Sequence, residues 1–224
     1  MIPFRSTTPL GFAALARSGW DKAAVAHSPE MKPVDYARLA QRAYTDPPTI
    51  GDPSSASRMH VYDSVHCFRG SDDIMAFLHD ADCRPLNVAG VGRVHSGFWH
   101  ALSAILPACL ALPRPTAVTG HSLGAAMAIL YAAVLARLNC VVPVYAFESP
   151  RLCADQELPE VFKAVNLPWY ATRNGEDVVT QIPLGYSLPG RLTSIGHACV
   201  PFANIQDHNI GRVVEALAEV AKAA

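Results

Sequence analysis

Apolar positions recur along this chain with two spacings, and each change of spacing marks a new element. Helical spacing runs through 34–44, through the stretch around Phe98, Leu102, Ile105 and Leu106, and through 123–138 and 213–224. Between these helices lie short apolar runs that predict strands, at 58–68, 87–94, 116–119, 141–147 and 169–172. Strands that alternate with helices indicate an α/β domain built on a central sheet.

The length of 224 residues suits one domain, which we place at 34–224. Residues 1–33 are rich in Pro, Ser and Ala and predict an irregular N-terminal leader. The apolar piece at 9–16 is short and begins at a proline, so it is a poor secretion signal and leaves the compartment unknown.

Composition narrows the possible partners. The formal net charge of −1 argues against a nucleic-acid groove or a polybasic membrane anchor. The longest apolar helical run, 123–136, is shorter than the roughly 20 residues that span a bilayer, so no transmembrane segment is expected. The six cysteines contain no Cys-x-x-Cys pair, and we interpret most of them as buried thiols, with one or two disulfides left open. The oligomeric state is left open as well.

The run Gly120-His121-Ser122-Leu123-Gly124 is a G-x-S-x-G motif between a predicted strand and a predicted helix. A sharp turn of this kind strains the serine backbone, and larger side chains at either glycine would collide with neighbouring chain. The turn exposes the Ser122 hydroxyl and brings the N–H of Leu123 to the same point, at a helix N-terminus. We therefore predict Ser122 as a nucleophile and interpret His121 as a packing residue.

Further segments extend this motif into a family resemblance. Residues 119–126 (TGHSLGAA) resemble the nucleophile block of the class 3, fungal-type lipases. Phe68-Arg69-Gly70-Ser71 is similar to the oxyanion motif of the family, and 94–98 and 36–44 resemble two further blocks in the same order. Residues 147–151 (FESPR) occupy the place of a strand that ends in Pro-Arg, although Glu148-Ser149 replaces a more usual Gly-Ala pair.

The resemblance implies an α/β-hydrolase fold, with a mostly parallel sheet covered by helices on both faces. It also implies a triad in the order Ser, Asp, His. Asp177 matches the acid, with Glu176 as the alternative. His208 matches the base, with His197 as the alternative, which we interpret as a structural histidine in a strand. The N–H groups of Ser71 and Leu123 are expected to form the oxyanion hole.

The segment after the oxyanion motif is expected to form a short lid helix. Ile74, Phe77 and Leu78 fall at i, i+3 and i+4, and Asp72 or Asp73 can cap the start. In the resembling family a mobile helix lies at this place, so we expect these three side chains to flank an acyl site and to make transient contact with a lipid interface.

These features together predict a serine carboxylic-ester hydrolase of lipase type, acting on acyl esters of glycerolipids. The alternatives are a non-lipid esterase such as a feruloyl type, a phospholipase A1, and a silent hydrolase fold that only binds. Neither a His-Glu-x-x-His spacing nor a Gly-x-Gly-x-x-Gly turn is present, so we expect no metal and no cofactor.

Overall fold

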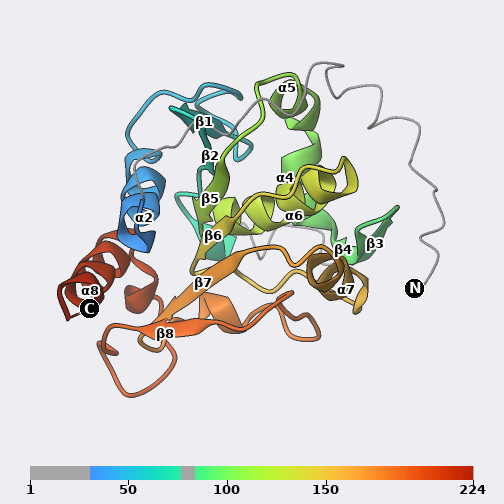
Figure 1. Ribbon diagram of the computed structural model, residues 1–224. Coiled ribbons are helices and arrows are strands. Elements are labelled where there is room, and N and C mark those ends of the chain that lie inside the picture. The colour runs from blue at the N-terminus through green and yellow to red at the C-terminus, as the bar shows by residue number, and fades with distance from the viewer. Residues whose placement is uncertain (1–30, 77–83, 224) are drawn as a thin grey trace.

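The structure, a computed structural model, describes residues 31–76 and 84–223 (Figure 1). Within this part of the chain a six-stranded sheet has the order β1-β2-β5-β6-β7-β8. Its strands are β1 (Met59–Tyr62), β2 (Val65–Phe68), β5 (Ala117–His121), β6 (Val144–Phe147), β7 (Trp169–Asn174) and β8 (Thr193–Ile195). β1 pairs with β2 antiparallel, and every later pair is parallel. The predicted mostly parallel sheet is confirmed.

Helices cover both faces of this sheet, as predicted (Figure 1). On one face lie α2 (Pro33–Arg42) and α8 (Ile210–Ala223), packed against each other and against the sheet. The other face carries α4 (Ser96–Ser103), α5 (Leu106–Leu110), α6 (Leu123–Arg137) and α7 (Glu157–Ala164). Two short 3₁₀ turns, η1 (Val179–Gln181) and η2 (Gln206–His208), flank the loops at the sheet edge.

Two of the expected strands are instead hairpins. Residues 58–68 form β1 and β2, joined through Asp63 at φ 53°, and the stretch at 87–94 belongs to the separate pair β3 (Pro85–Val88) and β4 (Gly92–His95). Asp and Gly tolerate the left-handed conformation that such reversals require, and Gly90 adopts φ 75°. The predictions of single strands were wrong because each tight turn lies inside one continuous run of strand-forming residues.

Helix α6 is the central element of the fold. Every residue from Leu123 to Ala136 is buried, between the sheet and the helices α4 and α7. Its many alanines allow a close approach to the strands. Because the helix is buried on all sides, it has no polar stripe. The helix therefore fixes the position of the residue that precedes it, Ser122.

The carboxyl ends of β5, β6 and β7 meet at one edge of the sheet. Ser122 follows β5, Glu148 follows β6, and Asp177 lies in the loop after β7. Such an edge is where parallel α/β sheets collect functional side chains. Among the described residues no helix is long and apolar enough to cross a membrane.

Residues 1–30 lie outside the described part, so the division into a leader at 1–33 and one domain at 34–224 stays a prediction. Of the cysteines in the described ranges, none forms a disulfide; Cys67, Cys109, Cys140 and Cys153 are buried and Cys199 is exposed.

Candidate active site

Ser122 stands at a strained turn between β5 and α6. Its backbone has φ 60° and ψ −128°, a conformation that costs a non-glycine residue about 1–3 kcal/mol. A Cβ on Gly120 would lie 2.4 Å from the carbonyl of Gly124, and a Cβ on Gly124 would lie 2.1 Å from the carbonyl oxygen of Phe68. The predicted steric need for both glycines is therefore confirmed. The Ser122 N–H donates to the Phe147 carbonyl at 2.9 Å and anchors the turn to β6.

Asp177 and His208 form a buried hydrogen-bonded pair. His208 Nδ1 lies 2.8 Å from Asp177 Oδ2, and Asp177 Oδ1 accepts from the Val179 N–H at 2.9 Å. Asp177 is fully buried and His208 is 7% exposed. An ionised Asp177 accepts a hydrogen at this position, so the pair holds the proton of neutral His208 on Nδ1 and leaves Nε2 as the basic nitrogen.

Two buried polar atoms at this edge have no hydrogen-bond partner among the described residues: Ser122 Oγ and His208 Nε2. The expected exposure of the Ser122 hydroxyl was therefore wrong, since Ser122 is only 1% exposed. Buried polar atoms are normally paired, and an unpaired one calls for an explanation. A hydroxyl and a basic nitrogen that both remain available suit a reaction in which one passes its proton to the other.

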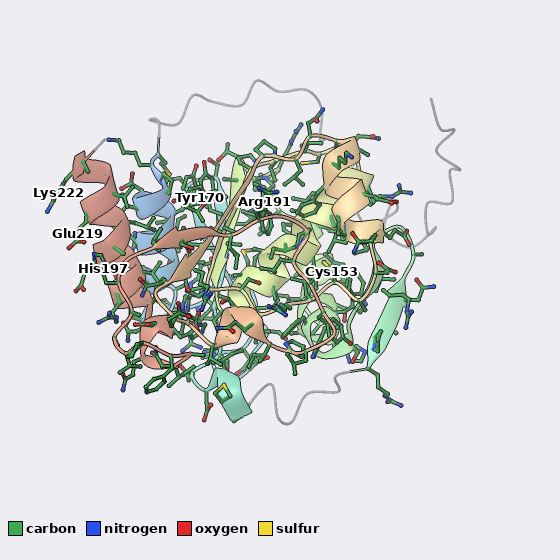
Figure 2. The ribbon with its side chains drawn as sticks, turned by 90° about the horizontal axis from the view of Figure 1, so that it is seen from below. Cys153, Tyr170, Arg191, His197, Glu219 and Lys222 are labelled. Carbon is green, nitrogen blue, oxygen red and sulfur yellow. The ribbon has the colours of Figure 1, made fainter. Side chains whose placement is uncertain are left out.

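The alternative acid and base are not brought to this pair. Glu176 forms an ion pair with Arg173, and its side chain is 44% exposed. His197 is exposed rather than held in a strand, because β8 ends at Ile195. Its carbonyl accepts from Arg212 at 3.2 Å, and it lies beside α8 at the periphery of the molecule (Figure 2). The interpretation of His197 as a structural strand residue was wrong.

Asp207 connects the loop of Asp177 to the loop of His208. Its buried carboxylate accepts from the N–H of Glu176 at 2.9 Å, from the Asn204 side chain at 2.9 Å and from the N–H of Cys199 at 3.0 Å. Burial opposes ionisation, but these hydrogen bonds outweigh it and lower the pKa of Asp207 to about 2. Asp207, which directly precedes His208, is thus a charged anchor for both loops.

We expect acid to weaken this anchor. Because the folded pKa of Asp207 lies below the ordinary value of about 3.9, its contribution to stability is present above about pH 4 and is lost as pH falls toward 2. Asp207→Asn should lower the free energy of unfolding by about 1–3 kcal/mol at neutral pH and flatten the acid arm of the stability curve. Denaturant unfolding across pH measures both effects.

Asp155→Asn is the matched control for this change. The Asp155 carboxylate also accepts two backbone N–H groups, from Arg93 and Glu157, but beside α7. Both variants should lose stability, and Asp207→Asn alone should also lose turnover, because it loosens the loop of His208. Equal turnover in the two variants would contradict the anchoring of His208 by Asp207.

His121 supports His208 from the other side. Its Nε2 donates to the His208 carbonyl at 2.8 Å, and its Nδ1 accepts from the Tyr44 hydroxyl at 2.7 Å. Burial, together with the neighbouring His208 ring, lowers the pKa of His121 well below its ordinary value. His121 is therefore a neutral hydrogen-bonding residue as well as a packing residue.

Glu148 is a further carboxyl at this site, and its position in the sequence indicated no function for it. It is fully buried, it has φ 54°, and its carboxyl contacts that of Asp177. Burial, and then the adjoining Asp177, raise the pKa of Glu148 well above its ordinary value. The sequence did indicate that Glu148 is unusual. It is a charged residue at the end of an apolar strand, where the resembling family has glycine.

The loop with Ser71 lies against the turn that holds Ser122. A Cβ on Gly70 would lie 2.8 Å from the carbonyl oxygen of His121, so the loop and β5 approach closely. The Ser71 hydroxyl donates to the Asp73 carbonyl at 3.0 Å and accepts from the Asp73 N–H at 3.2 Å. Leu123 is the first residue of α6 and is buried. Both backbone positions remain candidates for an oxyanion hole.

A cavity of about 690 Å³ opens over His208 and the Ser71 loop. Ile74 lies in its wall and is buried, whereas Met75 and Ile205 are 45% and 46% exposed. A helix begins at Ile74, and its start is capped by Asp73, which accepts from the Ala76 N–H at 2.9 Å. Phe77 and Leu78, the other two predicted lid residues, lie outside the described residues.

Comparisons with known proteins identify the family and the fold. A sequence model described as lipase (class 3) matches residues 65–187. Solved structures with the same fold include a lipase from Rhizopus microsporus var. chinensis, with 19% identity and a TM-score of 0.60 over 79% of this chain and 84% of that one. Lipase II from Rhizopus niveus has 18% identity and a TM-score of 0.59 over 79% and 91% of the two chains.

A deletion mutant of the Rhizomucor miehei lipase propeptide complex has 24% identity and a TM-score of 0.53, and the match covers 69% of this chain and 63% of that chain. Curated protein sequences yield no match to the chain. At these identities the solved structures establish the shared fold.

Proposed function

The chain belongs to the class 3 lipase family, and on that premise we propose that it hydrolyses acyl esters of glycerolipids through an acyl-enzyme on Ser122. Membership of this family makes the protein a carboxylic-ester hydrolase of the α/β-hydrolase fold. The observation that carries the residue assignments is the buried Asp177–His208 pair, which the hydrogen bond from His121 to the His208 carbonyl joins to the strained turn at Ser122. Ser122 Oγ and His208 Nε2 are both unpartnered within the described chain.

The first half of the reaction forms the acyl-enzyme. His208 Nε2 accepts the Ser122 proton while Oγ attacks the ester carbonyl, and the carbonyl π electrons move onto its oxygen. Collapse of the tetrahedral intermediate breaks the bond to the alkoxy oxygen, and His208 gives its proton to that leaving group. Asp177 holds the imidazole in the required tautomer and stabilises its cationic form.

The second half releases the acid. Water loses a proton to His208 Nε2 and attacks the acyl carbon, and the Ser122 oxygen leaves with the proton that His208 returns. The N–H groups of Ser71 and Leu123 stabilise the oxyanion in both halves. Each such donor is worth about 10²–10³ in turnover, and the partial positive charge at the start of α6 adds to this field.

The cavity supports a substrate with an apolar acyl chain. Ile74 contributes an apolar wall, and Met75 and Ile205 line the cavity with exposed side chains. Phe202, close to Ile205 in sequence, is 65% exposed. Ser122 is not among the residues that line this cavity, whereas His208 is. An acyl chain or a lipid surface that covers the exposed apolar side chains beside the cavity would remove their apolar area from water, which is favourable.

A hydrolysis profile tests the substrate class. We expect kcat/KM to rise with acyl length on p-nitrophenyl esters, and emulsified acylglycerols to be cleaved faster than a feruloyl ester or a phospholipid. A preference for the feruloyl ester would indicate a non-lipid esterase, and a preference for the phospholipid a phospholipase A1. Absence of any hydrolysis would identify a silent binding fold.

Apolar residues at the cavity should carry this preference. The double change Met75→Ser with Ile205→Ser should lower kcat/KM on emulsified long-chain esters about tenfold, because two apolar contacts with the acyl chain are lost. Dissolved short-chain esters should be affected far less. Val220→Ser is the control, since Val220 is 52% exposed on α8 and does not line this cavity. Equal losses on both classes of ester would exclude an acyl contact at these residues.

A further inference from the structure

Glu148 occupies a backbone position that disfavours its side chain. It follows β6 directly and has φ 54°, a left-handed conformation that costs an L residue with a Cβ about 1–2 kcal/mol. Its side chain is fully buried, although carboxyls are almost never fully buried unless they are paired. Strain and burial together indicate that a specific contact of this carboxyl is retained.

Three polar partners of the Glu148 carboxyl lie on β7 and in the loop that follows it. Oε1 accepts from the Thr172 hydroxyl at 2.9 Å, and Oε2 accepts from the Asn174 N–H at 2.8 Å. The third partner is the carboxyl of Asp177. Glu148 therefore joins the end of β6 to the residue that orients His208.

Two carboxyls in contact within a buried site do not both ionise, and the pair retains one proton. Both oxygens of the Asp177 carboxylate already accept hydrogen bonds, from His208 Nδ1 and from the Val179 N–H, so neither needs a proton of its own. Glu148 has the N–H of Asn174 and the hydroxyl of Thr172, and a hydroxyl can reorient to accept as well as donate. The retained proton is thus placed on Glu148.

We propose that Glu148 is a positioning residue of the triad: as a neutral carboxylic acid it donates a hydrogen bond to the Asp177 carboxylate and holds that carboxylate in place for His208. This inference rests on the proposed hydrolase mechanism. The acid adds a third donor to Asp177, beside His208 Nδ1–H and the Val179 N–H, without adding a second negative charge to a buried site.

The titratable groups that face this arrangement are His208, which contacts Asp177, and His121, whose ring lies 4.7 Å from that of His208 between centroids. His121 stays neutral because of its burial. The acid limb of the pH profile of kcat/KM therefore serves as a readout of the charge on the Glu148–Asp177 pair.

Three substitutions distinguish a hydrogen bond from Glu148 to Asp177 from an effect of side-chain packing or backbone strain. Glu148→Gln keeps the shape and a donor, since its amide can donate to Asp177 while its carbonyl accepts from Asn174. Glu148→Ala removes the donor and keeps the left-handed strain. Glu148→Gly removes the donor and also relieves the strain, so it is the matched control for a backbone effect.

We expect Glu148→Ala and Glu148→Gly both to lower kcat about ten- to hundredfold, the loss expected for one hydrogen bond to a charged group, with little change in KM. Glu148→Gln should recover most of that turnover and keep the acid limb of kcat/KM at the pH of the unaltered enzyme. Full activity in Glu148→Gly would overturn the proposal, because relief of the backbone strain would then restore turnover without any donor to Asp177.

The charge state of Glu148 can be measured separately from its effect on turnover. If Glu148 were ionised, Glu148→Gln would remove a negative charge and move the acid limb to lower pH by more than about half a unit, and this result too would overturn the proposal. Infrared difference spectra at about pH 8, where an ordinary carboxyl is ionised, should show the C=O stretch of a protonated carboxylic acid that Glu148→Gln lacks. Its presence in Glu148→Gln, or its absence from the unaltered protein, would refute the neutral acid.

Failure of the inference and failure of the proposed function are distinguishable. Without any ester hydrolysis by the unaltered chain, the proposed function fails while the infrared signal still reports the proton on Glu148. With normal hydrolysis and unaffected Glu148 variants, the hydrolase mechanism stands and the positioning by Glu148 does not.

Discussion

Ser122→Ala and His208→Ala are each expected to lower kcat by about 10⁴–10⁶-fold, because nucleophile and base act as a unit and the loss of either removes covalent catalysis. Initial-rate measurements on a soluble p-nitrophenyl ester are the direct check. A fluorophosphonate probe should label Ser122 in the unaltered chain, and the label should be absent in Ser122→Ala. Residual hydrolysis would reflect the oxyanion donors and binding alone.

The matched control for the base is His197→Ala. His197 is exposed beside α8, so its loss should leave both kcat and the melting temperature close to those of the unaltered protein. Circular dichroism and thermal unfolding should show that Ser122→Ala and His208→Ala remain folded. Retained activity in His208→Ala, with loss in His197→Ala, would disprove the assignment of the base.

Asp177→Asn should cost about 10⁴-fold in kcat, even though the side chain keeps its shape. An amide that turns its NH₂ group toward His208 Nδ1 favours the tautomer with the proton on Nε2, and that nitrogen then cannot accept the Ser122 proton. The amide also cannot stabilise the imidazolium by charge. Rate measurements as a function of pH test this effect, since the loss should persist at every pH where the protein is folded.

Glu176→Gln is the control for the acid. Glu176 precedes Asp177, but its carboxylate pairs with Arg173 near the surface, where an ion pair contributes little. We expect its kcat to stay within about threefold of the unaltered value, because a surface substitution of this kind changes little. A loss in Glu176→Gln as large as that in Asp177→Asn would mean that the loop as a whole, and not the Asp177 carboxylate, supports His208.

Short-range patterns predicted a large part of this fold. The long apolar helix after Ser122 and the buried strands before it and after it follow from spacing alone, since a central strand or helix is apolar along most of its length. The need for glycine on both sides of Ser122 could also be predicted, because the steric demand of the turn involves residues only a few positions away. The hairpins at β1–β2 and β3–β4 were missed, since a two- or three-residue reversal leaves little mark on the periodicity.

The site could be predicted only in part from the chain. Motif order selected Asp177 and His208 over Glu176 and His197, and in the structure the first two lie 2.8 Å apart through Asp177 Oδ2 and His208 Nδ1. Asp207 and His121 were not recognised as supports of His208, because each acts through contacts that join distant segments. Their catalytic consequences stay predictions until they are measured.

Glu148 shows most clearly where the local pattern ends and the tertiary structure begins. From the chain alone, a glutamate after an apolar strand is a departure from a motif, and its charge predicts a solvated side chain. Only the parallel pairing of β6 with β7 carries that carboxyl into the interior, against Thr172, Asn174 and Asp177. The helices, the strands and the steric demand of the turn at Ser122 depend on neighbours in sequence. The protonation of a buried group such as Glu148 depends instead on the charges and hydrogen-bond donors that folding brings together.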